Sequence, residues 1–282
     1  MTVKPFETAF QPPRPHHSDA EHGTTADGLA YAVSGPVDGD LIVLVHGAMD
    51  RMAGMHKLAR RLDDRCRVVR YDRRGYGLSA PHPGPFDIAA HVDDVVSLLD
   101  RFLGDGRRAV LVGHSIGGDI VLAAAQGATD QVGAVVAFEP PQSWEPWWPG
   151  EGATAGGAAL GVDPHDAAEA FMRRLIGDRL WERLPQSTKD ARRSEGPALV
   201  GELRDLRRAS PFDPAAIEQP VILGYSEFAK PHHHSGTASL AISLANATLV
   251  CVPGASHGAH ASHPELFVKL LVEPALRAAG FV

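Results

Sequence analysis

Short apolar runs alternate with amphipathic segments along most of this chain. Runs of strand length occupy residues 41–45, 67–71, 109–112, 133–138, 220–225 and 247–252. Several are apolar at nearly every position, which is typical of strands buried on both faces of a parallel sheet. Between two of them, Ile88, Val92, Val95 and Leu99 repeat at helical spacing and predict a helix over 87–103. Strands alternating with helices predict an α/β fold with a central, mostly parallel sheet flanked by helices.

The alternation of strands and helices starts after an N-terminal hairpin and is interrupted once by a helical segment. Residues 22–34 predict a β-hairpin around Asp27-Gly28, and the proline-rich residues 1–19 predict an irregular N-terminal arm. No strand pattern occurs from 141 to 214, where helical patterns cover about 164–184 and 187–209. We therefore expect a helical insertion at 141–214 in a core built from 20–140 and 215–282.

The segment around Ser115 carries the first chemical signal. Gly113, Ser115 and Gly117 form a Gly-x-Ser-x-Gly motif between an apolar strand and a good helix former. In a chain with 29 glycines the spacing alone arises by chance, so the strand–turn–helix context gives it its weight. Such a turn strains the serine backbone and directs its hydroxyl to a helix N-terminus, which favours negative charge. We predict that Ser115 is a nucleophile.

A nucleophilic serine requires a general base and a site for the oxyanion. His257 follows the last strand run, and the carboxyl ends of parallel strands meet at one edge of a sheet, so it can reach Ser115. The predicted oxyanion donors are the backbone N–H of Ile116 and an N–H of the loop that follows residues 41–45, most directly Ala48.

These segments together resemble the α/β-hydrolase family. The resemblance rests on His46-Gly47, on Asp72-Arg73-Arg74-Gly75-Tyr76-Gly77-Leu78-Ser79, on Gly113–Gly118 and on Pro253–His257, in that order. It implies an α/β-hydrolase fold in which the insertion is a helical lid. It also implies a structural role for the Asp72–Ser79 loop, and an acid that lies between the serine and the histidine in the chain.

The acid is where this sequence departs from the family. The resemblance leads us to expect Asp soon after the strand near Tyr225, but Ser226-Glu227-Phe228-Ala229-Lys230 follows, and an ungapped alignment puts Ala229 in the acid position. Glu227 is one candidate. The other is Glu139, which ends the run 133–138, a position from which some family members take their acid. We favour Glu139 as the third catalytic residue.

The resemblance and the insertion suggest a substrate class. Aromatic and sulfur side chains of the insertion, with Met49, indicate a largely apolar pocket for a small molecule, although each could instead form the core of the lid. They are Trp144, Trp147, Trp148, Phe171, Met172 and Trp181. We expect Met49, His114, Trp144 and Trp147 to bind substrate, and predict a serine hydrolase, specifically a carboxylic ester hydrolase. Two alternatives remain: carbon–carbon bond hydrolysis of a diketone, and a non-hydrolytic receptor or biosynthetic cyclase. A haloalkane dehalogenase is disfavoured because it needs a carboxylate where Ser115 stands.

Composition and charge exclude some classes of binding partner. The net charge of −7 and the absence of a long basic run argue against nucleic acid and anionic membranes. Paired arginines, Arg73-Arg74 among them, suggest solvated faces, and Cys66 and Cys251 suggest buried free thiols. His260, His263 and His232–His234 lack a carboxylate or cysteine at ligand spacing, so we expect surface histidines, no metal and no cofactor. With no signal-peptide pattern or membrane-length run, we expect a cytoplasmic monomer or homodimer.

Overall fold

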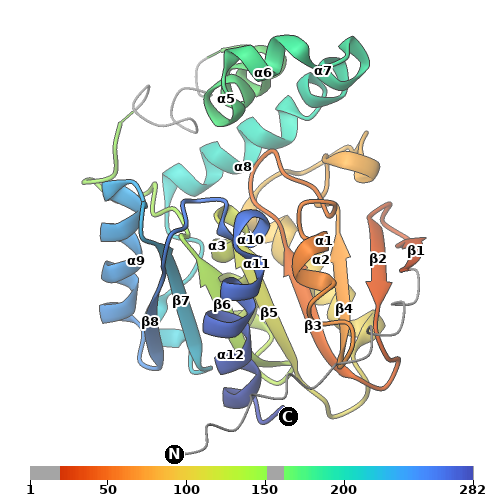
Figure 1. The fold of residues 1–282 in the computed structure, drawn as a ribbon, viewed down its shortest axis with the longest axis vertical. Helices are drawn as coiled ribbons and strands as arrows, with labels where there is room; N and C mark the ends of the chain where they lie inside the picture. The colour runs from red at the N-terminus through yellow and green to blue at the C-terminus, as the bar shows by residue number, and fades with distance from the viewer. Residues whose placement is uncertain (1–19, 151–161, 282) are drawn as a thin grey trace, which may run out of the picture.

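The computed structural model describes residues 20–150 and 162–281, so the expected arm at 1–19 and the loop at 151–161 lie outside the described part. One eight-stranded sheet organises the chain, with strand order β1-β2-β4-β3-β5-β6-β7-β8 (Figure 1). The strands are β1 (Glu21–Thr24), β2 (Ala30–Ser34), β3 (Asp40–Val45), β4 (Cys66–Tyr71), β5 (Ala109–His114), β6 (Val132–Phe138), β7 (Val221–Ser226) and β8 (Ala247–Val252). β1 and β2 pair as an antiparallel hairpin and β2 is antiparallel to β4, whereas β3 to β8 run parallel. The predicted mostly parallel sheet is confirmed.

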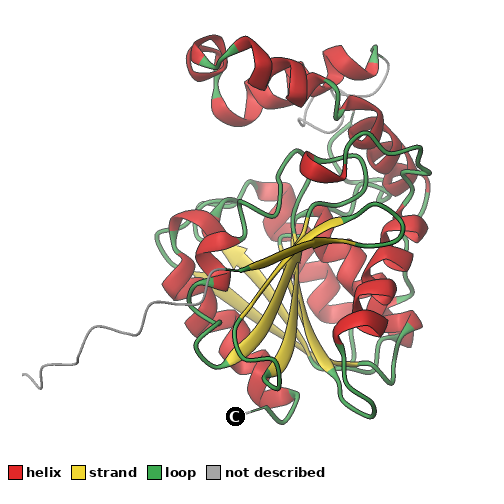
Figure 2. Cartoon of the chain, turned by 90° about the vertical axis from the view of Figure 1, so that its right-hand side faces the viewer, coloured by secondary structure: helices red, strands yellow, loops and turns green. Residues whose placement is uncertain are grey.

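Helices cover both faces of the twisted sheet (Figure 2). Helices α2 (Ile88–Phe102), α3 (Ile116–Gly127) and α9 (Pro231–Ser243) contribute to one apolar cluster. Helices α1 (His56–Ala59), α11 (Pro264–Phe267), η3 (Val268–Val272) and α12 (Glu273–Ala278) contribute to the other. Within β3, Val43 belongs to the first cluster and Leu44 to the second, as alternation along a doubly covered strand requires. The continuously apolar runs are therefore central strands.

The segment between β6 and β7 is helical and lies beyond the carboxyl ends of the strands (Figure 1). It contains α5 (Pro164–Ile176), α6 (Asp178–Arg183), α7 (Gln186–Arg193), α8 (Gly196–Arg208) and the short η2 (Pro214–Ala216). Each of the two predicted helical stretches is divided. Gly177, at φ +84°, separates α5 from α6, and Pro197 stands in the first turn of α8. We call α5 to α8 the cap.

Two helices differ from what the residue pattern predicts. The pattern predicts helices over about 53–62 and 235–245. The first is regular only in α1, and the second, α9, begins at Pro231. Proline is favoured in the first turn of a helix because its missing N–H has no acceptor there. The earlier start places His232–His234 inside the first turns of α9 rather than in a loop.

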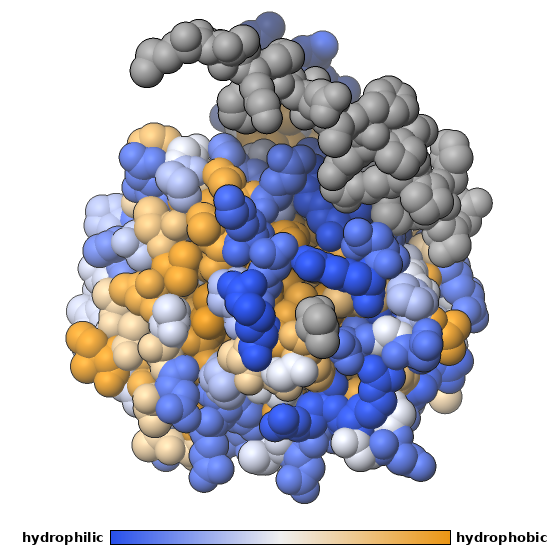
Figure 3. All heavy atoms as spheres, turned by 60° about the horizontal axis from the view of Figure 1, so that its bottom comes forward, coloured by the Kyte–Doolittle hydropathy of each residue, from blue (hydrophilic) through white to orange (hydrophobic). Residues whose placement is uncertain are grey.

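The surface away from the cap mixes charged and apolar side chains (Figure 3). Large exposed apolar residues such as Val37, Ile242 and Leu249 come from separate elements, as is normal for a protein surface. No helix in residues 20–150 and 162–281 is long and apolar enough to cross a membrane.

Candidate active site

The predicted nucleophile and Glu139 lie at neighbouring strand ends. His114, the last residue of β5, pairs with Phe138, the last residue of β6. The N–H of Ser115 donates to the carbonyl of Phe138, and the N–H of Glu139 donates to the carbonyl of Gly224 in β7, both at 2.9 Å. Strand pairing therefore fixes Ser115 and Glu139 side by side at the edge below the cap.

Backbone strain is concentrated at this edge. Among the described residues, three other than glycine have positive φ: Ser115 at 54°, Glu139 at 46° and Met49 at 55°. At Gly117 a β-carbon would lie 2.3 Å from the carbonyl oxygen of Val45, so the serine turn tolerates no side chain there. Strained non-glycine residues persist where the surrounding structure over-determines them, which is common at functional sites.

Glu139 is in contact with the predicted base. Its Oε2 lies 2.5 Å from Nδ1 of His257, and its other oxygen, Oε1, accepts hydrogen bonds from the N–H, at 2.8 Å, and the hydroxyl of Ser226. The Glu139 side chain is fully buried. Burial by itself raises its pKa, but the bonds from His257 and Ser226 outweigh burial, and the net pKa is lowered. The carboxylate is therefore ionised and orients the imidazole, whose second nitrogen lies on the opposite ring edge.

Glu227, the other candidate acid, has a different role. Its Oε2 accepts a hydrogen bond of 2.7 Å from the N–H of Gly254, in the turn after β8, and the residue is exposed. The structure thus places Glu139, and not Glu227, on His257. The sequence did not point to Ser226 as the residue that holds Glu139, because a serine at a strand end carries no signal without its partner.

The Ser115 hydroxyl makes no hydrogen bond to His257 in this structure. Within residues 20–150 and 162–281, Oγ of Ser115 has no hydrogen-bond partner. The His257 side chain is 34% exposed, so its free edge is accessible. Hydrogen bonds between nucleophile and base are often long in ligand-free enzymes and tighten with substrate.

The two predicted oxyanion donors come from different elements, Ala48 from the loop after β3 and Ile116 from the start of α3. Neither the N–H of Ala48 nor that of Ile116 donates to another described residue. The Arg73 guanidinium donates to the carbonyl of His46 at 3.0 Å and to that of Gly47 at 3.2 Å. Because C=O and N–H point in opposite directions in a trans peptide, the bond to Gly47 turns the Ala48 N–H away from Arg73. Arg73 therefore orients the predicted donor.

Arg73 is itself held by the cap. It is fully buried and pairs with the equally buried Glu202 of α8 at 2.5 Å, and the Tyr76 hydroxyl donates to the same carboxylate at 2.7 Å. Burial raises the pKa of Glu202, but Arg73 and His91 outweigh it and lower that pKa to about 2. The expectation that Arg73-Arg74 is a solvated pair is wrong. Arg74, too, is largely buried, paired with Asp94 of α2 at 2.6 Å, because a buried guanidinium requires a partner carboxylate.

The predicted substrate-binding side chains are dispersed. Met49 is 2% exposed and packs in the core of the cap with Met172 and Trp181. Trp144 packs edge-on against Phe212, and Trp147 is 45% exposed. His114 lies inside the site, where its Nε2 donates to the carbonyl of His257 at 2.8 Å. Contact of these residues with substrate stays a prediction.

Of the histidines expected on the surface, His260 is buried and His233 is half-buried against the predicted base. The ring of His233 stacks on His257, with centroids 4.6 Å apart and an interplanar angle of 24°. His260, in α10 (Ala259–Ser262), is 6% exposed. The sequence missed both because their neighbours come from other parts of the chain, whereas His263 is partly exposed as expected.

Comparison with known proteins identifies the family. The model of the "Alpha/beta hydrolase family" matches residues 42–270. The chain belongs to the alpha/beta hydrolase family. Over 249 residues this alpha/beta hydrolase is 29% identical to 2-(acetamidomethylene)succinate hydrolase of Mesorhizobium japonicum, covering 83% of the chain and 87% of that protein. It is 35% identical to esterase YbfF of Escherichia coli over 98 residues, or 35% of the chain and 37% of the relative.

Solved structures agree on the fold of this alpha/beta hydrolase. A hydrolase from Pseudomonas aeruginosa PA01 superposes with a TM-score of 0.70 at 26% identity, covering 93% of the chain and 99% of that structure. The enol-lactonase from Burkholderia xenovorans LB400 superposes with a TM-score of 0.66 at 23% identity, and the match covers 86% of the chain and 94% of that structure. The family and its relatives make the chain a hydrolase.

Proposed function

We propose that this alpha/beta hydrolase is a serine esterase that cleaves carboxylic esters through an acyl-enzyme on Ser115. One observation carries the proposal: the buried Glu139 carboxylate lies 2.5 Å from Nδ1 of His257, directly beside the strained Ser115 turn. A carboxylate there fixes the imidazole tautomer that has a free lone pair on Nε2, as a general base requires.

The proposed reaction has two halves. In the first, Oγ of Ser115 attacks the ester carbonyl while Nε2 of His257 takes the hydroxyl proton, and the tetrahedral oxyanion accepts hydrogen bonds from the N–H groups of Ala48 and Ile116. The C–O bond to the alcohol then breaks, and His257 returns the proton to the leaving oxygen. In the second half, water repeats the attack on the acyl-enzyme and releases the acid.

An apolar acyl or alcohol group is the substrate feature that the surroundings favour. Met49 joins the oxyanion loop to the apolar core of the cap, and Trp148 packs against His233 beside the catalytic histidine. The names of an esterase and an enol-lactonase among similar proteins support ester chemistry on this fold. Motion of the cap as a lid is part of this proposal, since the cap lies over the strand ends (Figure 1).

Two assays test the proposal. A fluorophosphonate probe should label the wild-type protein on Ser115 and leave Ser115→Ala unlabelled, because the probe traps an activated serine. A panel of nitrophenyl esters of rising acyl length should be hydrolysed by the wild type and not detectably by Ser115→Ala, with unchanged thermal unfolding as the control for folding. A wild-type protein that neither labels nor hydrolyses any ester would instead support the non-hydrolytic alternative.

The second candidate reaction, hydrolysis of the carbon–carbon bond of a diketone, has one supporting observation. The similarity to 2-(acetamidomethylene)succinate hydrolase extends over 83% of the chain, further than the similarity to the esterase. Labelling of Ser115 without turnover of esters would favour hydrolysis of another acyl bond, including the carbon–carbon bond of a diketone. The probe and the ester panel together distinguish these outcomes.

A further inference from the structure

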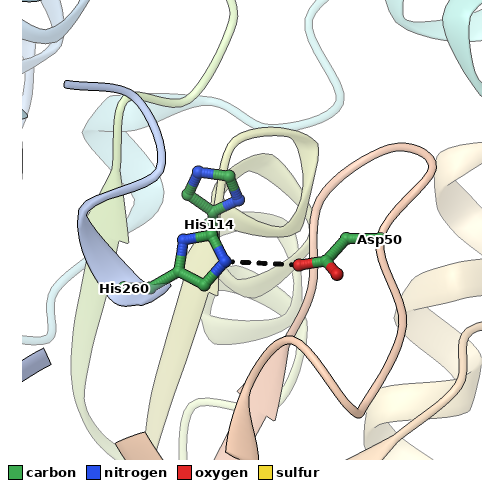
Figure 4. Close-up of side chains that lie close together, drawn as sticks. All are labelled: Asp50, His114 and His260. Carbon is green, nitrogen blue, oxygen red and sulfur yellow. Dashed lines mark ion pairs between the residues drawn. The ribbon is translucent and has the colours of Figure 1, made fainter. Parts of the chain in front are cut away.

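Three side chains that take no part in the proposed bond-making and bond-breaking steps meet near the end of β5. Asp50 comes from the loop after β3, His114 from the end of β5 and His260 from α10 (Figure 4). One donor atom from each lies within 4.8 Å of the others. Nε2 of His260 is 3.3 Å from Oδ2 of Asp50, and the two imidazole centroids are 4.0 Å apart.

The histidines have unused lone pairs in this cluster. Nε2 of His114 lies 2.8 Å from the carbonyl oxygen of His257, and a carbonyl only accepts, so Nε2 carries the hydrogen. Nδ1 of His114 is then a bare acceptor, and it is buried without a partner among the described residues. Nδ1 of His260 is also buried and without a partner in that part of the chain. A buried acceptor with no donor is costly unless something binds it.

The outer contacts are those that metal ligands use. A metal-binding histidine usually donates its other N–H to a carbonyl or carboxylate, as His114 does to His257. A ligating carboxylate is in turn hydrogen-bonded, and Oδ1 of Asp50 accepts from the Arg51 N–H at 2.8 Å.

We propose that Asp50, His114 and His260 bind one divalent transition-metal ion of the zinc class. Two imidazoles and one carboxylate suit Zn²⁺ and its neighbours, whereas Mg²⁺ and Ca²⁺ prefer oxygen ligands alone. Three protein ligands leave a coordination position open. The sequence analysis discounted His260 because no carboxylate stood at ligand spacing, and the fold supplies Asp50 from the loop after β3.

The proposed metal site is next to the catalytic histidine, so a bound ion affects hydrolysis. The rings of His114 and His257 are 4.7 Å apart. A cation bound to His114 disfavours the imidazolium that His257 becomes during turnover. The bound ion therefore inhibits hydrolysis, an effect that rests on the proposed function, whereas metal binding itself does not.

Binding is measured first and without turnover. We expect titration calorimetry of the chelator-treated protein to show one Zn²⁺ per chain and Co²⁺ to give the visible absorption of a four-coordinate complex, with Mg²⁺ binding far more weakly. Asp50→Asn and His260→Gln should weaken Zn²⁺ binding at least tenfold. The control is His263→Gln, a partly exposed histidine whose Nδ1 contacts Ser262 at 2.9 Å, and it should bind as the wild type does.

Thermal unfolding of each metal-free variant verifies that it is folded before the titration. Wild-type protein that binds no Zn²⁺ overturns the proposal, as does unchanged affinity in either folded ligand variant. His233→Gln addresses the second cluster, in which Glu139, His233 and His257 approach one another. Loss of binding in His233→Gln, with binding retained in His260→Gln, would place the ion on the triad and also refute the assignment.

Inhibition is measured second. Added Zn²⁺ should lower the hydrolysis rate of the wild type and of His263→Gln, each relative to its own metal-free rate, and should lower that of His260→Gln much less. Equal inhibition of all three proteins would contradict the inhibitory role. An inactive wild type that binds Zn²⁺ would refute the esterase proposal and leave the metal site supported.

Discussion

The guanidinium of Arg73 and the carboxylate of Glu202 form a fully buried ion pair, 2.5 Å apart, between the loop after β4 and helix α8 of the cap. The same guanidinium holds the carbonyl of Gly47, whose peptide carries the Ala48 N–H. The cap therefore contributes to the shape of the predicted oxyanion hole as well as covering the strand ends.

The first prediction concerns this link. Arg73→Lys keeps a positive charge for Glu202, but an ammonium cannot reproduce the planar fork that bridges carboxylate and carbonyls. We expect kcat for ester hydrolysis to fall about 10- to 100-fold with little change in KM, less than the roughly 100- to 1,000-fold that follows removal of an oxyanion donor. Steady-state kinetics on a nitrophenyl ester measure the change.

Arg74→Lys is the matched control. Arg74 also forms a buried pair, with Asp94, and its remaining side-chain hydrogen bond goes to the carbonyl of Pro85, so among the described residues it makes none to the oxyanion loop. A similar loss of kcat in both variants would show that the effect is general destabilisation and would refute a positioning role for Arg73.

The second prediction separates the two candidate acids. Glu139→Gln loses the charge that stabilises the His257 imidazolium and the acceptor that fixes its tautomer, so we expect kcat to fall roughly 1,000-fold or more. Glu227→Gln should retain most of the wild-type rate, because the Glu227 carboxylate accepts a hydrogen bond from Gly254 and from no other described residue. The two variants are assayed side by side. An almost normal Glu139→Gln beside an inactive Glu227→Gln would move the acid to the later strand.

The third prediction is a loss of stability in acid. The folded-state pKa of Glu202 is about 2 and its ordinary value is 4.5, so the unfolded chain binds the extra proton between these values. The stabilisation is complete above pH 4.5 and is lost as the pH falls towards 2, by on the order of 2–3 kcal/mol. Urea unfolding of the wild type and Glu202→Gln across this range measures it. Parallel pH profiles for the two proteins would rule out Glu202 as the cause.

The fourth prediction is a loss of stability as the pH rises, the opposite of the effect of Glu202. Burial raises the pKa of Asp119, in the first turn of α3, well above 3.8, and neither carboxyl oxygen has a partner among the described residues. The folded state then keeps a proton that the unfolded chain releases, so this group lowers stability as pH rises above 3.8. Asp119→Asn removes that dependence. The free energy of unfolding of the variant, relative to that of the wild type, should therefore rise by about 1 kcal/mol or more from pH 4 to pH 8. Denaturant unfolding at the two pH values is the measurement, and an unchanged difference would contradict it.

The sequence by itself determined the local structure and the resemblance to the alpha/beta hydrolase family. Apolar runs that are buried on both faces appear as such in the residue pattern, and six strands lie within one or two residues of the predicted ranges. The Ser115 turn was recognisable in part because Gly113 must lack a side chain where it meets the backbone of nearby Gly117, although Gly117 itself packs against the distant Val45. Information of this kind is local, and a linear pattern retains it.

Tertiary structure alone decided which side chains meet. The order β5-β6-β7-β8 puts Glu139 beside Ser115 and Ser226 beside Glu139, a juxtaposition that the sequence, which left two carboxylates open, could not supply. Docking of the cap buries Arg73, which looked solvated because its partner carboxylate is on a distant helix. The approach of α10 to the loop after β3 likewise gives His260 its carboxylate. Burial of a charge depends on its compensating partner, and when that partner is remote in the chain only the folded structure reveals it.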